Sequence, residues 1–480
     1  MKIKYFFLII IFSLKVSSQA TIFPDTNFDI GSGFNNSQGV NTVVQQSDGK
    51  ILVGGEFTNF NGLSKNRLVR LNSNGSIDLD FNIGSGFGGF VNSIVIQPDG
   101  KILIGGTLVS YNGTLKRAIV RLNSDGSLDS NFNVENIFAN CINQSGGGGY
   151  VLDIKIQNDG KILCVGSFLN LQGYNNIIRL NQDGSIDYSF CVCVSLYTTP
   201  SIAIQNDGKI LIGLYQTVMR LNNDGSVDYT FNCLGLTGGS NGLIFSIAID
   251  IDNKILVGGQ FSSFNGSNQN YLVRLNSDGS LDNNFNLGVA FSYSILPNYG
   301  NVQTILPLSN GKILIGGQFD TFNGYNSNYL IKLNSDGTRD NGFNIGIGFN
   351  LPTHIIFLQP DGKLLIGGNF SAFNGQDYNN LIRLSDNNLS ANSFLDKVSL
   401  ITIYPNPTNS KISINCSNQI DLIGSEIKIT NALGQEIYKS ILSQQIQDIS
   451  LSSVATSGLY FVTVVNKSGN TITTKKIMLQ

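Results

Sequence analysis

A block that recurs seven times constrains this chain more than any other feature. In its consensus form the block has an Asp-Gly-Lys turn, an apolar run ending in Gly-Gly, the triplet Arg-Leu-Asn and a second Asp-Gly turn, and its cleanest copy spans residues 94–132. A repeat of this length predicts units that bury their apolar faces against their neighbours. The lysines after the first turn are 45 to 60 residues apart, at Lys50, Lys101, Lys161, Lys209, Lys254, Lys312 and Lys363.

Each copy of the block predicts four short strands. In the cleanest copy they are expected at residues 94–97, 101–106, 118–123 and 127–132, because Asp-Gly turns separate the apolar runs. The apolar run of the second strand does not alternate, which is typical of a strand buried on both faces. Its Gly-Gly end predicts a close backbone approach or a bulge. Four antiparallel strands in about 50 residues is the pattern of a propeller blade. We therefore predict an all-β fold, with residues 21–394 forming a seven-bladed β-propeller of four-stranded blades.

The N-terminal segment predicts how this ring closes. Residues 25–34 repeat the motif that ends a complete unit at residues 78–87, whereas the last unit ends weakly with Asp386-Asn387-Asn388 in place of an Asp-Gly turn. We expect the segment around Phe28 to complete or overlay the last blade, close to Arg383.

A cation recurs in the Arg-Leu-Asn triplet of every copy, and we interpret it as structural. Catalytic sites break a repeat, so we expect an ion pair or hydrogen bond with the Asp of the same blade rather than a cation facing the central channel. The cations are Arg70, Arg121, Arg179, Arg220, Arg274, Lys332 and Arg383.

The second turn, Asn-Ser-Asp-Gly-Ser-x-Asp, resembles half of a calcium-binding loop but lacks the distal Glu that completes one. A hairpin turn whose last Asp caps backbone amides explains the same residues. The only histidine is His354, and no Cys-x-x-Cys occurs, so zinc is disfavoured. We predict no cofactor, no metal ligand and no catalytic residue, and keep calcium as the minor alternative.

The six cysteines do not define a disulfide pattern, because six allow fifteen pairings. Cys193 and Cys233 follow the repeat phenylalanines at nearly matching places, so a bridge between neighbouring blades is one alternative. The other is that the cysteines are small buried hydrophobic residues.

The N-terminus reads as a signal peptide. Lys2 and Lys4 precede an apolar run at residues 6–14, and small residues follow up to Ala20. The run is far shorter than the roughly 20 residues of a membrane helix. We expect residues 1–20 to be cleaved and the mature chain to contain no transmembrane segment. With 13% charged residues and a net charge of −2, nucleic acid is not an expected partner.

The irregular loops define the candidate binding face. Both Asp-Gly turns of each blade are expected on one rim, and the Phe-Asn-Gly loops and the blade-to-blade links on the other. The second rim carries the insertions at residues 134–150 and 287–301 and the lost loop near residues 214–216. Recognition commonly lies in such loops on a rigid scaffold. The candidate binding residues are Glu135, Tyr150, Tyr293, Tyr299 and Asp320.

The C-terminal region is predicted as a separate small β-sandwich at residues 401–480, after a linker at residues 395–400. Strands are expected at residues 411–415, 426–430, 437–441, 459–465 and 471–478. Its motifs Tyr-Pro-Asn-Pro-Thr, Asn-Ala-Leu-Gly-Gln and Ser-Gly-Leu-Tyr-Phe-Val, followed by Lys-Lys-Ile, resemble the type A C-terminal sorting domain of the type IX secretion system. The residues that carry the resemblance are Tyr404, Pro405, Asn406, Pro407, Gly434, Gly458, Tyr460, Lys475 and Lys476.

This resemblance implies a Bacteroidetes-type protein whose partner is the type IX secretion machinery, and which is released or attached to the outer cell surface. The repeats resemble the delta-60 repeat propellers, which imply architecture and no established activity. We predict a non-enzymatic module that binds an extracellular glycan or protein. The alternative is a secreted carbohydrate-active hydrolase or lyase that uses carboxylates on the irregular rim, since a glycosidase needs only two acids.

Overall fold

The structure is a computed structural model of the chain. It describes residues 22–35, 39–132, 134, 137, 149–169, 175–192, 194, 196, 198, 200–232, 236–237, 242–264, 266–296, 299–386, 401–404, 408, 410–415, 422–431, 435–444, 446–451, 456–465 and 471–479. The predicted signal peptide, Glu135 and both cysteines of the suggested bridge, Cys193 and Cys233, lie outside these residues.

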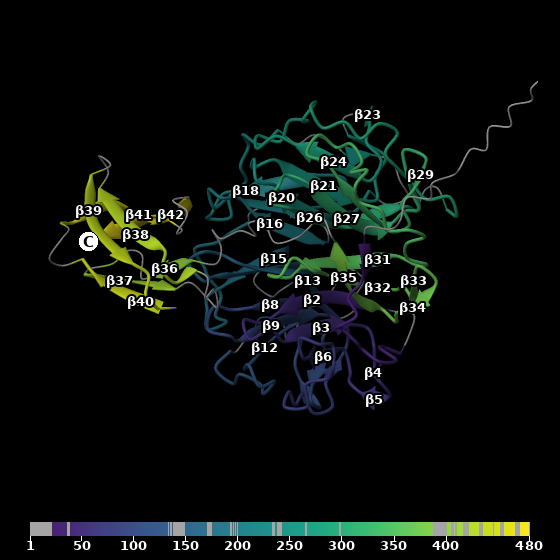
Figure 1. Ribbon diagram of the computed structural model, residues 1–480, viewed down its shortest axis with the longest axis horizontal. Helices are drawn as coiled ribbons and strands as arrows, with labels where there is room; N and C mark the ends of the chain where they lie inside the picture. The colour runs from purple at the N-terminus through teal and green to yellow at the C-terminus, as the bar shows by residue number, and fades with distance from the viewer. Residues whose placement is uncertain are drawn as a thin grey trace, which may run out of the picture.

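Each of the seven repeats forms an antiparallel sheet with three main strands (Figure 1). The first strands are β2 (Val40–Gln45), β8 (Val91–Ile96), β13 (Tyr150–Ile156), β16 (Ser201–Ile204), β20 (Ile244–Ile249), β26 (Asn301–Pro307) and β31 (Thr353–Leu358). The second strands are β3 (Ile51–Gly55), β9 (Ile102–Gly106), β14 (Ile162–Leu169), β17 (Ile210–Gly213), β21 (Ile255–Gly259), β27 (Ile313–Gln318) and β32 (Leu364–Gly368). The third strands are β6 (Leu68–Leu71), β12 (Ile119–Leu122), β15 (Asn175–Leu180), β18 (Val218–Leu221), β24 (Leu272–Leu275), β30 (Leu330–Leu333) and β35 (Leu381–Asp386).

The seven sheets close into a ring. Each first strand packs against the first strand of the next sheet, from β2 through β8, β13, β16, β20, β26 and β31, and β31 packs against β2 again. Strands nearest the axis of a propeller come closest to their neighbours, so the first strands line the centre. The seven-bladed all-β propeller predicted from the repeats is therefore confirmed.

The second strands are buried on both faces, as their unbroken apolar runs predicted. Ile51, Leu52 and Val53 of β3 are fully buried, and Leu52 packs in one cluster with Val91 and Ile94 of the next blade. Each such side chain contributes roughly 1.5–3 kcal/mol by leaving water. Apolar packing between blades therefore supplies the main adhesion of the ring.

The Gly-Gly pairs end the second strands where no side chain fits. A Cβ on Gly54 would lie 2.5 Å from Cγ1 of Val91 in the next blade, and one on Gly55 would overlap the carbonyl oxygen of Gly39. The pairing of β2 with β3 also shifts register between Val40 and Thr42, opposite these glycines. Both consequences predicted from the glycines, the close approach and the bulge, occur together.

The fourth strand of the blade is reduced in the structure. In blade one only a single bridge, Leu71 with Ile77, follows the second turn, and the equivalent pairs recur in blades two to six. The chain then turns at Asp78, whose Oδ1 accepts a hydrogen bond from the N–H of Asp80 at 3.2 Å. This Asx turn ends the pairing, so the full-length fourth strand expected at residues 127–132 of blade two is replaced by one bridge and a turn.

The last blade gains a true fourth strand from the start of the chain. β1 (Ile22–Pro24) pairs with β35, and the N–H of Asp25 donates to the carbonyl of Arg383 at 2.8 Å. Asp25 Oδ2 accepts from Arg383 Nε at 2.7 Å, and the Arg383 guanidinium lies 4.5 Å from the centre of the Phe28 ring. The predicted closure of the ring by the segment around Phe28 is confirmed.

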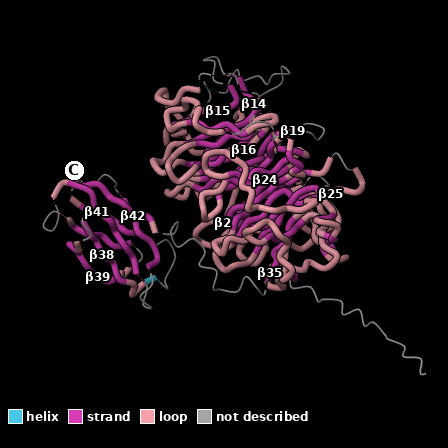
Figure 2. The backbone as a smooth tube through the Cα atoms, turned by 90° about the horizontal axis from the view of Figure 1, so that it is seen from above, coloured by secondary structure: helices cyan, strands magenta, loops and turns pink. Residues whose placement is uncertain are grey.

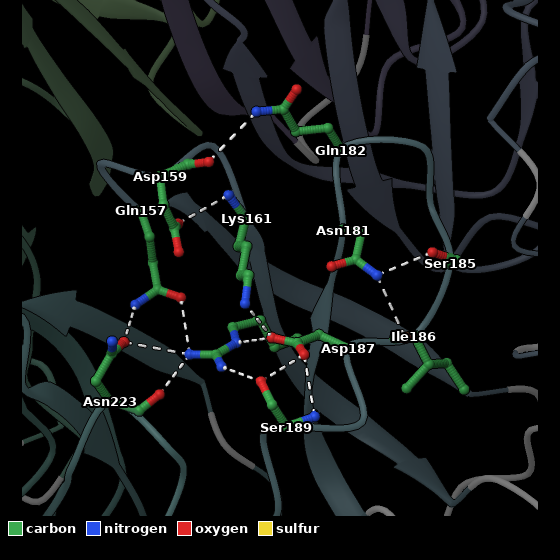
Figure 3. Close-up of polar contacts among 11 residues, drawn as sticks. Gln157, Asp159, Lys161, Asn181, Gln182, Ser185, Ile186, Asp187, Ser189 and Asn223 are labelled. Atoms are coloured by element: carbon green, nitrogen blue, oxygen red, sulfur yellow. Dashed lines mark hydrogen bonds and ion pairs between the residues drawn. The ribbon is translucent and has the colours of Figure 1, made fainter. Parts of the chain in front are cut away.

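The recurrent cation pairs with the Asp of its own blade, as predicted (Figure 3). In blade three, Asp187 Oδ2 accepts from Arg179 Nε at 2.6 Å and from Lys161 Nζ at 2.8 Å, and the arginine lies over the Phe190 ring. Ser189 Oγ donates to the other carboxylate oxygen at 2.6 Å. The Asp-Gly-Lys lysine and the triplet arginine thus share one buried carboxylate.

The same arginine also ties each blade to the next. Arg179 Nη1 donates to the carbonyl of Asn223, which belongs to the second turn of blade four (Figure 3). Arg274 makes the equivalent bond to Ser335 at 2.6 Å, and Arg383 closes the ring with one to Ser73 at 2.6 Å. The triplet arginine is therefore a contact between blades as well as within them.

The two kinds of loop lie at opposite ends of the blades. Ile51 pairs with Leu71, so both Asp-Gly turns emerge at one edge of the sheet and the Gly-Gly end lies at the other. We call the edge that carries the Gly-Gly ends the loop rim. Its hairpins are β4 (Asn59–Phe60) with β5 (Leu63–Ser64), β10 (Ser110–Tyr111) with β11 (Thr114–Leu115), β22 (Ser263–Phe264) with β23 (Ser267–Asn268), β28 (Thr321–Phe322) with β29 (Tyr325–Asn326), and β33 (Ala372–Phe373) with β34 (Gln376–Asp377).

Each of these hairpins is fastened to the preceding link. Asn61 and Gly62 both have positive φ, 49° and 75°, as a tight hairpin turn requires. The Asn61 Oδ1 accepts the N–H of Gly33 at 3.0 Å, which holds the link against the hairpin. In three blades a short strand of the link joins the hairpin sheet, namely β7 (Phe87–Gly88), β19 (Leu236–Thr237) and β25 (Phe291–Ser292). Blade four has a short turn instead, closed by Leu214 N–H to the Thr217 carbonyl at 2.9 Å.

The C-terminal domain contains two sheets (Figure 2). Their strands are β36 (Thr402–Tyr404), β37 (Lys411–Asn415) and β40 (Ile446–Ser450) in one sheet, and β39 (Glu436–Ile441), β38 (Glu426–Asn431), β41 (Gly458–Val465) and β42 (Thr471–Leu479) in the other. Ile412, Ile427 and Val462 are fully buried in the core that both sheets share. The five predicted strands are present, and β36 and β40 were not predicted.

The sorting motif is divided between these strands. Lys475 and Lys476 lie on β42, opposite Val462 and Phe461 of β41. The Tyr460 hydroxyl donates to the Thr456 carbonyl at 2.7 Å. Tyr404 ends β36, Gly458 begins β41, and Pro405, Asn406, Pro407 and Gly434 lie outside the described residues. None of the described segments is a helix of the length and hydropathy needed to cross a membrane.

Candidate binding pocket on the loop rim

An open pocket of about 400 Å³ lies on the loop rim between blades six and seven. Four segments far apart in the sequence form it: the link before blade six, the loop rim of blade six, the link after blade six, and the hairpin of blade seven. Its lining residues are Ser294, Ile295, Asp320, Asn328, Tyr329, Ile347, Gly348, Phe349, Asn350, Ala372 and Gly375. The pocket thus lies where the insertion at residues 287–301 meets the last two blades.

Asp320 supplies the carboxylate of the pocket. It follows β27, and its N–H donates to the Ser292 carbonyl at 3.0 Å. Its Oδ2 accepts from the N–H of Ser294 at 2.8 Å and from the Ser294 hydroxyl. Its Oδ1 is covered by protein and has no hydrogen-bond partner. One face of this carboxylate is therefore fixed to the link, and the other keeps unused acceptor capacity.

Tyr329 forms a wall of the pocket from a strained backbone position. Its φ is 67°, a left-handed conformation that a bulky side chain rarely adopts. The N–H of Tyr329 donates to the Phe319 carbonyl at 2.9 Å, and its own carbonyl accepts from Thr353 Oγ1 at 2.6 Å. Such a conformation costs of order 1–3 kcal/mol and persists only where the surroundings impose it. The blade scaffold therefore holds this ring in place.

The left-handed position before the third strand recurs in the other blades with different side chains. The equivalent residues are Arg67, Ala118, Asn176, Tyr271 and Asn380. The backbone of the blade thus sets the conformation, and the identity of the side chain varies. A repeated backbone with a variable side chain is the arrangement expected of a scaffold that presents different groups on one rim.

The Tyr329 hydroxyl is neutral at ordinary pH. Burial raises the pKa of Tyr329 to about 12, helped by the Tyr293 hydroxyl and by the negative charge of Asp320. A protonated phenol both donates and accepts hydrogen bonds. The Tyr329 hydroxyl can therefore bind a polar ligand group.

Two amides and two exposed apolar side chains complete the pocket. Asn328 Nδ2 donates to the Ile347 carbonyl at 2.7 Å, and Asn350 Oδ1 accepts from the N–H groups of Ser371 and Ala372, both at 3.0 Å. These bonds fix the link after blade six as a wall. Ile295 and Ile347 are each 68% exposed. Exposed aliphatic groups beside fixed polar groups are typical of a ligand site.

The structure separates the five candidate residues named from the sequence. Asp320 lines this pocket, whereas Tyr293 is buried behind the lining and hydrogen-bonded to Tyr329. Tyr299 belongs to the same insertion, half exposed, with its N–H bonded to the Leu296 carbonyl. Tyr150 begins β13 of blade three, opposite Ser167, and Glu135 lies outside the described residues. Tyr329, Asn328 and Asn350 were not predicted. Asn328 and Tyr329 stand directly before the third strand of blade six, and Asn350 follows a Gly-x-Gly-Phe sequence. An alignment of the seven copies of the block at these two positions would have drawn attention to all three residues.

The described residues offer little for catalysis. His354 is buried on β31, and burial lowers its pKa to about 4, against the raising effect of its bond to the Val40 backbone. No group of three or more His, Cys, Asp or Glu side chains that could hold a metal occurs in the part of the chain that the structure describes. The second-turn aspartates cap backbone amides, as Asp125 does with Ser127 N–H at 2.9 Å. Cys164 is buried, and burial raises the pKa of its thiol.

The fold and its loop rim define the class of protein as a seven-bladed β-propeller followed by a small β-sandwich domain. Sequence-family models give the family. The domain of unknown function DUF5122, a β-propeller repeat, matches seven segments, at residues 46–81, 97–132, 157–190, 205–231, 252–285, 308–343 and 359–387. The secretion system C-terminal sorting domain matches residues 402–480. The chain therefore carries seven DUF5122 β-propeller repeats and a type IX secretion sorting domain, and it is a secreted or cell-surface protein.

Two bacterial proteins are among the solved structures with a similar fold. PorZ, a surface component of the type IX secretion system of Porphyromonas gingivalis, is 14% identical, with a TM-score of 0.44 over 95% of this chain and 61% of PorZ. The extracellular domain of BT4673 from Bacteroides thetaiotaomicron is 13% identical, with a TM-score of 0.44 over 95% of this chain and 62% of that domain. With identities and TM-scores this low, neither similarity bears on function. A search of curated proteins finds no match.

Proposed function

We propose that this secreted propeller is a non-enzymatic binding module, and that the pocket between blades six and seven binds an extracellular glycan. The type IX machinery delivers the chain to the cell exterior or surface, where polysaccharides are the abundant polar polymers. The loop-rim pocket can admit ligands of that kind because it is open to solvent and its walls are loops held by hydrogen bonds to backbone groups.

The observation that carries the proposal is the composition of the pocket. A carboxylate, the Tyr329 hydroxyl and two fixed amides lie beside the exposed aliphatic groups of Ile295 and Ile347. Sugars present hydroxyl groups around an apolar ring face, so this combination matches both of their surfaces. The polar groups are already oriented by backbone hydrogen bonds, so little ordering is needed when a ligand binds.

The number of carboxyl groups that line the pocket favours binding over hydrolysis. Canonical glycosidases use two carboxyl groups, about 5–5.5 Å apart in retaining enzymes and about 6.5–9.5 Å apart in inverting ones. Asp320 is the one acid among the residues that line the pocket. A polymer can be held at this site, but the second acid for cleavage is not supplied by its lining.

The test is a glycan array probed with the mature chain, followed by a polysaccharide-release assay on every glycan that binds. The wild type and Asp377→Asn should bind the same glycans, because Asp377 is an exposed acid of the blade-seven hairpin outside the pocket lining. Asp320→Asn should bind more weakly. Release of sugar fragments that stops with Asp320→Asn would overturn the binding-only proposal.

A further inference from the structure

We propose that the pocket recognises a glycan that carries a free amino group, so that an ammonium ion of the sugar pairs with Asp320. This inference rests on the proposed function and specifies the substrate class of the same pocket. Three observations carry it: the missing cation of Asp320, the charge of the surrounding segments, and the supply of hydrogen-bond donors.

The blade aspartates at the opposite rim show how this propeller neutralises a buried carboxylate. The seven blade aspartates each pair with one Lys from the first turn and one Arg or Lys from the third strand. Asp320 is also partly buried, yet it forms no ion pair within the described part of the chain. A partly buried carboxylate without a cation is costly, and a cationic ligand offsets that cost.

The segments around the pocket carry only negative charge. Residues 286–301, 318–329, 344–353 and 369–380 contain no Lys, Arg or His, and their only acids are Asp320 and Asp377. The cations that pair with the blade aspartates of blades five to seven belong to the first turn and the third strand. A further cation, Arg339, lies 5.1 Å from the centre of the Tyr325 ring on the blade-six hairpin, outside the lining of the pocket. An anionic ligand would therefore meet repulsion in this pocket, and a cationic group would meet attraction.

Ser294 and Asn328 already use their donors within the protein. Ser294 donates its N–H and its hydroxyl to Asp320 Oδ2, and Asn328 donates to Ile347. Asp320 Oδ1 has no donor, and a buried acceptor left in this state destabilises the protein by about 1–3 kcal/mol. Since this oxygen is covered by protein, a ligand meets the carboxylate as a charge in the pocket wall.

An ammonium ion fits all three observations, because it is a cation, it is attracted by the negative charge of Asp320, and it donates hydrogen bonds. A sugar hydroxyl and an ammonium ion can both form a charge-assisted hydrogen bond with a carboxylate, but only the ammonium ion also neutralises the charge of Asp320. Amino sugars supply the ammonium ion on the same ring whose apolar face suits Ile295 and Ile347. N-acetylation removes the charge while keeping the ring, so it provides a matched ligand pair.

The experiment compares two probes by isothermal titration calorimetry on the mature chain: the glucosamine hexamer and the N-acetylglucosamine hexamer. We expect the glucosamine hexamer to bind about tenfold more tightly at low salt, with the preference shrinking as salt screens the pair. Asp320→Asn should reduce the preference to less than about twofold, and Asp377→Asn should keep it. Ile347→Lys, which places a cation at the pocket edge, should also abolish the preference if Asp320→Asn fails to fold.

The outcomes separate this inference from the proposed function. Equal affinity for the two hexamers would overturn the ammonium inference and leave glycan binding standing. Binding of neither hexamer, together with an empty glycan array, would overturn both. A lysine hexapeptide that binds through Asp320 while the glucosamine hexamer does not would also overturn the proposal, because the cationic partner would then be a protein.

Discussion

Replacing Asp25 by Ala should open the propeller ring. Asp25 Oδ2 holds Arg383 at 2.7 Å and Lys363 at 2.9 Å, and its N–H bonds to the Arg383 carbonyl. It directly follows β1, whose Ile22 is fully buried. Without the carboxylate, Arg383 stays buried without its counterion, and the strand that completes blade seven loses its anchor.

The magnitude follows from the burial of the pair. Arg383 and Asp25 are each only 6% exposed, and removing one partner of a buried pair costs about 3–5 kcal/mol. Asp129→Ala in blade two breaks the same contacts with Arg121 and Lys101 without touching a chain end, so it is the matched control. Detachment of β1 adds the exposure of Ile22, about 1.5–3 kcal/mol. Asp25→Ala should therefore lower the free energy of unfolding more than Asp129→Ala.

Urea unfolding followed by circular dichroism measures this difference, and hydrogen–deuterium exchange locates it. Asp25→Ala should increase exchange at β1 and β35, which pair with each other, while blade two stays protected. Asp129→Ala should raise exchange in blade two and its neighbours instead. Equal stability of Asp25→Ala and the wild type, with β35 still protected, would refute closure by the N-terminal segment.

Three further predictions follow from the blades. Arg121→Ala should lower the free energy of unfolding by about 3–5 kcal/mol because it leaves a buried carboxylate unpaired, whereas Lys101→Ala, whose side chain is 30% exposed, should cost less than about 1 kcal/mol in the same urea titration. Burial raises the pKa of Asp129, but Lys101, a backbone amide and Arg121 together hold that pKa below its usual value. Its stabilisation is thus present above about pH 4 and lost as the pH falls through the lowered pKa. Unfolding measured between pH 5 and pH 2 should therefore show a shallower loss of stability for Asp129→Asn than for the wild type. Gly106→Ala should destabilise by about 3 kcal/mol or more, because its Cβ would overlap a backbone carbonyl, while Gly113→Ala, which meets no atom, should cost only about 1–2 kcal/mol for its positive φ.

Each of these three predictions has a result that would contradict it. Equal losses for Arg121→Ala and Lys101→Ala would show that the shared carboxylate does not depend on its buried partner. If the free energy of unfolding fell equally with pH for Asp129→Asn and the wild type, Asp129 would not contribute to the loss of stability in acid. A well-folded Gly106→Ala variant as stable as Gly113→Ala would mean that the strand can shift to admit a side chain.

The ring and its closure could be predicted because the signals are local and repeated. The motif at Phe28 is recognisable as the end of a unit that lacks its beginning. Arg383 belongs to the last unit, which has no Asp at the place where the other units carry the Asp that pairs with this cation. The bond from Arg179 to the Asn223 carbonyl could not be predicted in the same way. It depends on how close the second turn of the next blade comes, and ring geometry sets that distance.

The fourth strand was predicted too long because the sequence does not show when pairing stops. Ser127–Leu128 continue the polar–apolar alternation of a strand, but the Asx turn at Asp129 takes the backbone away after one bridge. The carboxylate of Asp129 serves Arg121 and Lys101 at the same time. A residue that pairs with two cations and also closes an Asx turn cannot continue a strand.

The pocket was predicted in part. Asp320 and Tyr293 stand out because they interrupt a uniform rim. Tyr329 does not stand out, because the residue before the third strand varies from blade to blade and no motif marks it. Its place at the pocket depends on the left-handed backbone conformation at this position. Tyr150 was grouped with them because loops of one rim look alike in sequence, yet it lies in blade three, away from the pocket between blades six and seven.

The most direct test of where this protein binds is hydrogen–deuterium exchange of the mature chain with and without saturating glucosamine hexamer. The proposed site predicts protection confined to residues 294–296, 320–329, 347–350 and 372–375, the segments that line the pocket. The same protection should be absent in Asp320→Asn. Protection at residues 134–150, or in the C-terminal domain, with residues 320–329 unchanged, would contradict the proposed site.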